Sequence, residues 1–516
     1  MKLGSLVAIT VAVVLAFAAP LAAQERGGAL KVALFPEPPT AVAGLSGLGS
    51  ASIVSSKIYE ALVKFDFELK PQPWLASSWE KSDDGLIWTF NLVENAKWHD
   101  GKPFTAADVV ASYQVFSVEN DRLKLVADKV KKVEATSKHQ VRFTLEESIP
   151  SFIYMLNYGN LPIIPAHLYA GGNFRENPAN STPIGTGAFY IKEWKKGSFI
   201  HLARFNDYRD GTKPYLDDLY FVIIPDAQGC AVAFEEGSVD VVSASNLEGF
   251  DVSRLASLDG VKSTTKGWEM LAPHAFLWIN TQKVPLDDVK LRQALNYALD
   301  KNFVRDVVFS GLATPPRGAF DSRTLFFDPS VNAYEFDVEK AKALVAASSY
   351  KGEVLRLSTA PVGSAWARLA EYEVQAWKEI GLNVELDTND VGGYLKKLGE
   401  RTYDLGNIYL YQYGDPAVGV TRNFYSRNDV IGSPWNNVGR YSNPRLDELL
   451  AKADAVGDAA NRSALYAQAQ KIIADDAVQV WTAELQFPTL YRARVRDLIT
   501  TALGLSDSFE NVWIEK

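Results

Sequence analysis

The sequence predicts an α/β protein built from at least two lobes. Short segments with alternating apolar residues, such as 29–34, are typical of strands, whereas longer segments repeat apolar residues every three or four positions, as helices do. Strands and helices alternate along the chain, which indicates the α/β class. Its 516 residues exceed what one hydrophobic core usually supports. The sequence contains no repeat or flexible linker, so we expect ordered crossings to join the lobes.

The first half of the chain is predicted to consist mainly of strands. After the strand at 29–34, a segment rich in Gly and Ser at 44–56 predicts a loop, which leads into a predicted helix around 58–63. Prolines and a Gly pair between 162 and 172 mark a boundary, and residues 188–226 are predicted to be rich in strands.

The second half is predicted to be more helical. Asp287 and Asp288 are candidate caps for a helix that Gly311 would end, and Asn443 followed by Pro444 predicts the start of another helix. The same periodicity predicts two further amphipathic helices. The inward-facing residues of these four helices are Leu291, Leu295, Ala298 and Leu299; Leu446, Leu449 and Leu450; Val338, Ala341, Leu344 and Val345; and Leu465, Ala469, Ile472 and Ile473.

The N-terminus has the pattern of a secretory signal peptide. Lys2 supplies the positive start, residues 6–19 form an uncharged apolar run, and small residues precede the polar Gln24. This run is too short for a membrane span, and no later stretch reaches the ~20 apolar residues that a span requires. We therefore predict a signal peptide at 1–23 and export to the periplasm. The only cysteine, Cys230, is far from the cut, so we expect neither a lipid anchor nor a disulfide, and a buried apolar role for Cys230.

Charge and motif content exclude several function classes. A net charge of −9 argues against nucleic-acid binding, which requires concentrated Lys and Arg. The sequence has no Gly-x-Ser-x-Gly elbow, zinc helix motif or phosphate loop, so we expect no catalytic residues and no enzyme, with a secreted hydrolase kept as the alternative. The histidines show no paired spacing, so no metal site and no cofactor are expected; they are His99, His139, His167, His201 and His274.

The strongest motif lies at 88–92 and 98–112. An alternating strand leads into an Asp-Gly turn, and Thr105 caps a helix with Asp108 at the fourth position of a capping box. These features specify a fold, so His99 and Asp100 are interpreted as structural residues. The two segments closely resemble the signature of the family 5 extracellular solute-binding proteins, the dipeptide-, oligopeptide- and nickel-binding proteins of ABC importers.

Further matches spread this resemblance over the whole mature chain. The Ile-Asn-Thr at 279–281 and the Arg-Gln-Ala-Leu at 292–295 look like the family's second signature. The segments at 185–189, 206–208, 213–217 and 441–444 are also similar to the family pattern.

The resemblance implies a type II periplasmic binding protein fold, with two lobes, a hinge and an additional inserted domain. The expected division places 24–64, 185–266 and 487–516 in lobe I, 65–184 in the inserted domain and 267–486 in lobe II. Crossings near 267 and 486 would form the hinge that closes the lobes on a ligand. The implied function is that of a monomeric periplasmic binding protein, whose partners are a small ligand and the permease subunits of an ABC transporter.

The resemblance also indicates where the ligand binds. Peptide-binding relatives hold the ligand's ammonium group with an aspartate a few residues before an Asp-Pro pair. In this chain Gln412 takes that position, and Asp415 is the only acid in the loop. An arginine for the peptide carboxylate is also missing around 358–366. The first lobe would contribute the loop formed by Ser46, Gly47 and Leu48.

Aromatic residues take the place of the missing charges. Tyr409, Tyr411 and Tyr413, with Gln412 and the later Trp435, would suit a sugar-like or opine-like ligand as well as a peptide. Along a regular strand the three tyrosines share one face, and Gln412 lies on the other. The sequence alone leaves open whether the tyrosines or Gln412 face the ligand, and whether the ligand is a peptide, an oligosaccharide or an opine-like compound.

Overall fold

The computed structural model describes residues 24–120, 122–359 and 363–516. The predicted signal peptide at 1–23 lies outside these residues. Within the described part of the chain, no helix joins enough length to enough apolar character to span a bilayer. The beginning and the end of this part lie side by side, because Lys516 Nζ is 3.5 Å from a carboxylate oxygen of Glu25.

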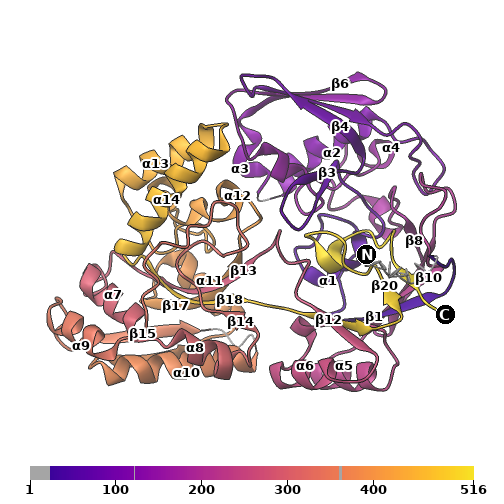
Figure 1. Cartoon of the computed structure of the whole chain (residues 1–516). Helices are drawn as coiled ribbons and strands as arrows, with labels where there is room; N and C mark the ends of the chain where they lie inside the picture. Colours follow the sequence, from indigo (N-terminus) through magenta and orange to yellow (C-terminus); the bar gives the residue numbers. More distant parts are fainter. Residues whose placement is uncertain (1–23, 121, 360–362) are drawn as a thin grey trace, which may run out of the picture.

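A seven-stranded sheet forms the centre of the right-hand half of the molecule (Figure 1), called here the seven-stranded half. Its order is β12-β19-β11-β1-β10-β9-β8, with β1 parallel to both of its neighbours. Helices α5 and α6 pack on this sheet, where Cys230 is buried and unpaired, as predicted. The bounds are β1 (Ala29–Leu34), β8 (Phe189–Lys195), β9 (Phe199–Arg204), β10 (Asp218–Ile223), β11 (Val241–Ser243), β12 (Val261–Thr264), β19 (Thr489–Arg492), α1 (Gly49–Ser55), α5 (Ala227–Glu235) and α6 (Gly249–Ala256).

A six-stranded sheet of order β14-β18-β13-β17-β15-β16 forms the other half, called the six-stranded half. Here β15 runs parallel to β16 and β17, whereas β13 is antiparallel to β17 and β18. The bounds are β13 (Pro273–Ile279), β14 (Ala313–Thr314), β15 (Val354–Thr359), β16 (Asn383–Thr388), β17 (Leu405–Tyr411), β18 (Gln479–Leu485), α7 (Val289–Tyr297), α8 (Lys301–Phe303), α9 (Val338–Ala346), α10 (Ser364–Glu379), α11 (Val391–Glu400), α12 (Pro416–Gly419), α13 (Pro444–Ala455) and α14 (Ala459–Asp475).

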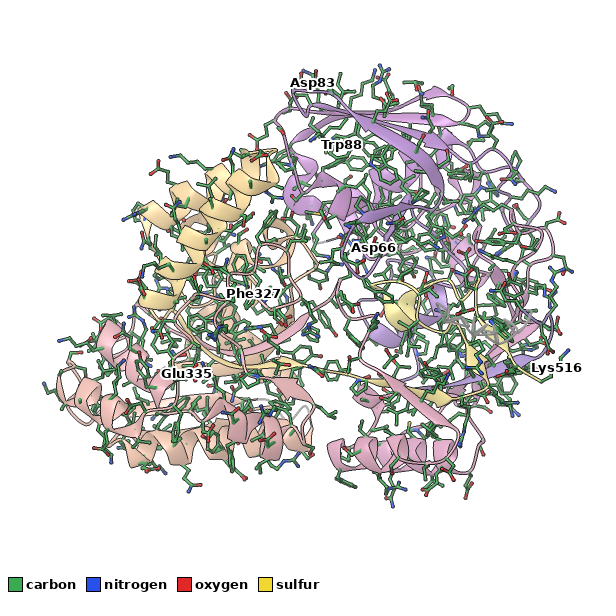
Figure 2. The ribbon with its side chains drawn as sticks, in the orientation of Figure 1. Asp66, Asp83, Trp88, Phe327, Glu335 and Lys516 are labelled. Atoms are coloured by element: carbon green, nitrogen blue, oxygen red, sulfur yellow. The ribbon has the colours of Figure 1, made fainter. Side chains whose placement is uncertain are left out.

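A third unit, the four-stranded unit, lies above the seven-stranded half in Figure 1. Its antiparallel sheet has the order β4-β5-β7-β6. Trp88 on β5, labelled in Figure 2, is buried, and its ring lies beside the rings of Phe90 and Phe152. The bounds are β4 (Ala76–Lys81), β5 (Ile87–Leu92), β6 (Val130–Ser137), β7 (Gln140–Leu145), α2 (Ala106–Glu119), α3 (Lys124–Ala127) and α4 (Ala166–Tyr169); the short pairs are β2 (Val63–Phe65) with β3 (Pro71–Pro73) and β20 (Val495–Arg496) with β21 (Trp513–Ile514).

The motif at 98–112 joins the four-stranded unit to the seven-stranded half. The predicted capping box is confirmed, since the Thr105 N–H donates to Asp108 Oδ2 at 2.8 Å. The His99 Nδ1 accepts a hydrogen bond from the Gly185 N–H, and its Nε2 lies 2.9 Å from the Gly187 carbonyl oxygen. Burial lowers the pKa of His99 to about 4, so the ring is neutral. This geometry gives His99 a structural role.

The chain crosses between the two halves twice, at 265–272 and at 486–488 (Figure 1). The first crossing joins β12 to β13, and the second joins β18 to β19. The rings of Trp268 and Phe487 meet edge to face, with their centroids 5.1 Å apart. The two crossings therefore pack on each other and are not independent tethers.

The predicted helix around 58–63 is wrong. The helix lies earlier, at α1, and residues 57–62 run through the buried core without helical structure. Their carbonyl groups are used by other segments, because the Gly187 N–H donates to Ile58 and the Leu75 N–H donates to Ala61. The apolar run thus reflects burial against neighbouring segments.

The predicted caps of the second half are confirmed at Asp288 and Asn443. The first of these helices, α7, nevertheless ends at Tyr297 and not at Gly311. Asp300 is the reason, since its side chain accepts the N–H groups of Asn302 and Phe303 and caps a new helix.

Candidate functional site

A cavity of about 680 Å³ lies where the two halves and the four-stranded unit meet. The parallel strands β15 and β17 end at Thr359 and Tyr411, and both residues line this cavity. Ligands of open α/β sheets bind outside the carboxyl ends of such strands. Gly47 lines the cavity from the seven-stranded half, and Arg122, Lys124 and Leu125 line it from the four-stranded unit. The other lining residues are Trp366, Val391, Tyr394, Leu395, Asn407, Ile408, Tyr409, Leu410, Tyr413, Arg422, Ser433, Trp435 and Asn436.

A row of aromatic rings follows β17 along the cavity. Tyr409, Tyr411 and Tyr413 lie edge to face with centroids 5.7 and 6.0 Å apart, and Trp366 stacks on Tyr409 at 5.7 Å. Burial raises the pKa of Tyr411 well above its ordinary value, so its hydroxyl stays protonated at neutral pH. The row offers a ligand several ring faces and neutral hydroxyl groups.

Residues of both faces of β17 line the cavity, and the tyrosines lie on one of these faces. Strand alternation brings Tyr409 and Tyr411 to one face, and Tyr413 follows past the end of the strand with a φ of 55°. Leu410, which alternation assigns to the opposite face, also lines the cavity, as do Tyr394 and Leu395 of α11. The cavity thus extends around the end of the strand toward α11.

Arg122 reaches the row from the opposite side of the cavity. Its guanidinium group lies 4.1 Å from the centre of the Tyr413 ring, which is a cation–π distance. The Arg122 Nε donates to Asn160 Oδ1 at 2.5 Å, and Nη2 donates to the Gly159 carbonyl oxygen at 2.8 Å. These contacts fix a positive charge at the cavity.

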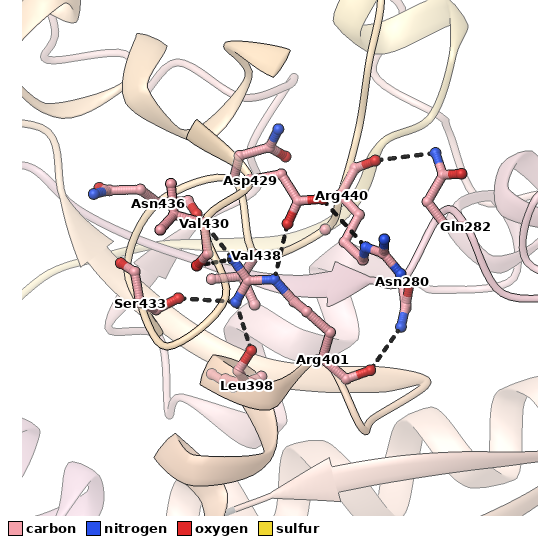
Figure 3. Close-up of polar contacts among 12 residues, drawn as sticks. Asn280, Gln282, Leu398, Arg401, Asp429, Val430, Ser433, Asn436, Val438 and Arg440 are labelled. Carbon is pink, nitrogen blue, oxygen red and sulfur yellow. Dashed lines mark hydrogen bonds and ion pairs between the residues drawn. The ribbon is translucent and has the colours of Figure 1, made fainter. Parts of the chain in front are cut away.

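A loop after β17 supplies Ser433, Trp435 and Asn436, and Arg401 holds this loop in place (Figure 3). Arg401 is buried at the end of α11, where its backbone adopts a left-handed φ of 61°. The guanidinium group donates to the carbonyl oxygens of Leu398, Val430, Ser433 and Asn436 and to the Asp429 carboxylate; the shortest of these bonds, to Leu398 and Ser433, are 2.6 and 2.8 Å.

Gln412 does not line the cavity, in contrast to its predicted role. Its Oε1 accepts hydrogen bonds from the Asp321 N–H at 2.9 Å and from Thr324 Oγ1 at 2.6 Å, and its Nε2 donates to the Ala319 carbonyl oxygen at 2.8 Å. The side chain is 5% exposed, so these partners satisfy it within the six-stranded half. The physical reason is this set of hydrogen bonds and not the face of the strand, because Ile408 and Leu410 lie on the same face and do line the cavity.

Asp415 does not line the cavity either. It is fully buried and forms a two-pronged ion pair with Arg462, with N–O distances of 2.8 and 2.9 Å. Asp415 Oδ1 also caps α12 by accepting the Ala417 N–H at 3.0 Å. The acid in this loop therefore stabilises the six-stranded half and is not available to a ligand.

The remaining predicted residues differ in their placement. Gly47 and Trp435 line the cavity, and Trp435 is 41% exposed at its rim. Ser46 and Leu48 are not among the lining residues. The Ser46 hydroxyl accepts the Leu48 N–H at 3.2 Å, and Leu48, 44% exposed, precedes α1.

Sequence reasoning missed the cations of the site, Arg122, Lys124 and Arg422. No local signal marks Arg122 or Lys124, which lie far from β17 in the chain and reach the cavity only through tertiary packing. Trp366 was detectable only as part of a tryptophan-rich composition.

A buried acidic cluster lies away from the cavity, near the crossings. Donor atoms of His274, Asp321 and Glu484 lie within 4.8 Å of one another. Both oxygens of Asp321 accept hydrogen bonds from Arg323, at 2.6 and 2.7 Å. Burial opposes ionisation of Asp321, yet Arg323 and His274 hold its pKa below its ordinary value. The arrangement is that of a buried ion-pair cluster in which an arginine already satisfies the aspartate.

Comparisons with known proteins agree with this architecture. The dipeptide-binding protein of Escherichia coli is 30% identical over 500 residues, which cover 89% of this chain and 90% of the relative. The ABC transporter-associated periplasmic binding protein DppA from Helicobacter pylori, solved with the peptide STSA, superposes with a TM-score of 0.80 at 25% identity, over 95% of this chain and 99% of that chain. AgaA from A. tumefaciens R10, solved with agropinic acid, gives 0.79 at 27% identity over 95% and 99%.

The family comparison covers most of the chain. The model of the bacterial extracellular solute-binding proteins, family 5 Middle, matches residues 70–431. The predicted periplasmic binding protein fold is confirmed by the solved relatives. The chain therefore belongs to the family 5 bacterial extracellular solute-binding proteins.

Proposed function

We propose that this protein is the periplasmic solute-binding component of an ABC importer and delivers a small polar organic ligand to permease subunits in the inner membrane. The observation that carries the proposal is the cavity of about 680 Å³, lined from both halves, in a member of this family. Its volume falls within the range of small-molecule sites, about 300–1,000 Å³. Peptide-like, oligosaccharide and opine-like ligands are the candidates, and the solved relatives with a peptide and with agropinic acid support a small organic molecule.

Closure of the lobes on the ligand is part of this proposal. Lobe I would comprise 24–64, 185–266 and 487–516, the inserted domain 65–184, and lobe II 267–486. The separate sheets of these segments support the division, and the paired crossings at Trp268 and Phe487 support a hinge. Because the crossings pack on each other, both would bend as one element.

Binding without turnover fits the lining of the cavity. None of its described lining residues is an aspartate, glutamate, histidine or cysteine. Glycoside hydrolysis commonly uses a pair of carboxyl groups beside the scissile bond. We therefore propose a protein that binds its ligand without turning it over. Turnover of peptides or oligosaccharides by the purified protein would contradict this proposal. Separately, the N-terminal sequence and the family resemblance support a monomeric protein that is exported after removal of residues 1–23 and is not lipid-anchored.

A thermal-shift screen of small peptides, oligosaccharides and opine-like compounds tests the proposed function. A true ligand at 100 times its Kd adds about 2.7 kcal/mol to the free energy of unfolding. Tyr411→Ala should weaken any hit about 10-fold or more, because it removes the central ring of the row. The matched control is Tyr190→Ala on β8, which lies outside the cavity lining. A hit that responds equally to both variants would place the ligand elsewhere.

A further inference from the structure

The described lining of the cavity is cationic. Arg122, Lys124 and Arg422 line it, and no described lining residue carries a carboxylate. Two acids of the surrounding half supply no free negative charge: Asp415 is paired with Arg462, and burial raises the pKa of Glu373 to about 8. Glu373 lies behind Asn407, whose Nδ2 donates to it at 2.6 Å, and is uncharged at neutral pH.

Arg122 is held only by uncharged groups. Its partners are the Asn160 side chain, the Gly159 carbonyl oxygen and the Tyr413 ring, and it forms no ion pair with a described carboxylate. Arginine carries five N–H donors in a planar fork, and Nε and Nη2 account for the side-chain bonds made here. A fixed guanidinium group with uncharged neighbours and unused donors at a cavity is suited to a carboxylate.

The aromatic row alone leaves the ligand's charge open. Ring faces attract cations as well as apolar groups, so the stack of Trp366, Tyr409 and Tyr411 could accommodate an ammonium group. A cationic ligand would, however, share the cavity with the positive side chains of Arg122 and Lys124 and with no described carboxylate of the lining. Like charges in a partly desolvated cavity repel strongly, so the charge of the lining decides against a cation.

We infer that the ligand is a small organic acid, with a net negative charge, a carboxylate that pairs with Arg122 and an apolar or ring-bearing body that packs on the tyrosine row. The protein offers no acidic anchor for a free ammonium group in the described lining. This inference rests on the proposed function, because it assigns the chemistry of the ligand that the same cavity captures.

Three probes that share an Ala-Phe body and differ in their end groups, and therefore in net charge, test the inference by calorimetry: N-acetyl-Ala-Phe, Ala-Phe and Ala-Phe-amide. They carry a net charge of about −1, 0 and +1 at pH 7, following the ordinary pKa values of their end groups. The acetylated acid should bind tightest, with the amide about 10- to 100-fold weaker, which is the range of a lost charge-assisted hydrogen bond. The preference should shrink as salt is added.

Two variants locate the effect. Arg122→Gln should reduce the preference for the acetylated acid about 10-fold or more and leave the fold intact by circular dichroism. The matched control is Arg175→Gln, an exposed arginine of the same unit that pairs with Glu119 and does not line the cavity. An unchanged preference in Arg122→Gln would overturn the assignment of the carboxylate to Arg122.

The outcomes separate the inference from the proposed function. Equal or tighter binding of the zwitterion or the amide overturns the organic-acid assignment, while the proposed function stands because the cavity still binds a small ligand. Binding of none of the probes, and of none of the compounds in the thermal-shift screen, overturns both.

Discussion

The buried pair of Asp415 and Arg462 allows a quantitative test of the claim that this acid serves stability and not the ligand. Asp415 is 0% exposed and Arg462 4% exposed, and two hydrogen bonds of 2.8 and 2.9 Å join them. Asp415→Asn removes the charge, keeps the shape and leaves a buried guanidinium group without its counter-ion. Such a loss costs about 3–5 kcal/mol. For a unit of about 200 residues this corresponds to a fall in Tm of about 6–20 °C.

Thermal unfolding of a double-mutant cycle measures this effect. We expect Asp415→Asn and Arg462→Met each to be strongly destabilising, and the double variant to cost much less than their sum, because the charges depend on each other. The matched control is Asp475→Asn on the same helix as Arg462, where an exposed pair with Lys471 should contribute under ~1 kcal/mol. Additive effects of under ~1 kcal/mol at Asp415 and Arg462 would refute the reasoning.

Three further variants test other features of the fold. Glu373→Gln should remove one part of the pH dependence of Tm. Burial raises the folded pKa of Glu373 to about 8, so the contribution of this group to stability is fully present below its unfolded pKa of ~4.3 and is lost as pH rises to about 8; parallel curves of wild type and variant would contradict this. Gly185→Ala should lower the free energy of unfolding in urea by several kcal/mol, since the new Cβ would lie 1.7 Å from the Ile58 carbonyl oxygen. The control Gly211→Ala has open space around its new Cβ and should change this free energy by less than about 0.5 kcal/mol. Equal urea midpoints of the two variants would refute the steric account. Arg401→Met should lower the free energy of unfolding by roughly 2–4 kcal/mol, because several carbonyl groups lose their hydrogen-bond donor. It should also speed amide hydrogen exchange at 429–437, and unchanged exchange would show that other contacts hold the loop.

Local signals made much of the fold predictable. The strand at 29–34 and the caps at Thr105, Asp288 and Asn443 depend on neighbouring residues, and the structure confirms them. The helix predicted around 58–63 failed because its apolar residues are buried by segments distant in sequence. Local periodicity cannot distinguish that origin from amphipathic helix packing.

In the candidate site, too, some features could be predicted from local sequence and others depend on tertiary contacts. Alternation correctly grouped Tyr409 with Tyr411 and separated Gln412 from them. It could not predict that residues of both faces of the strand line the cavity while Gln412 does not, because tertiary contacts determine this. The charge of the site could not be predicted, because Arg122 comes from a different unit and is brought to Tyr413 by the packing of that unit.

The binding of Arg401 to so many carbonyl groups has a consequence for the thermodynamics of capture. A loop that must order itself around its guest loses conformational entropy at every binding event, and that loss weakens affinity. Here a buried side chain behind the loop has already fixed its path, within the fold and before any guest arrives. Selectivity among guests should then depend on the side chains that the loop presents and only weakly on its ability to adapt. We expect a narrow range of accepted shapes as a result.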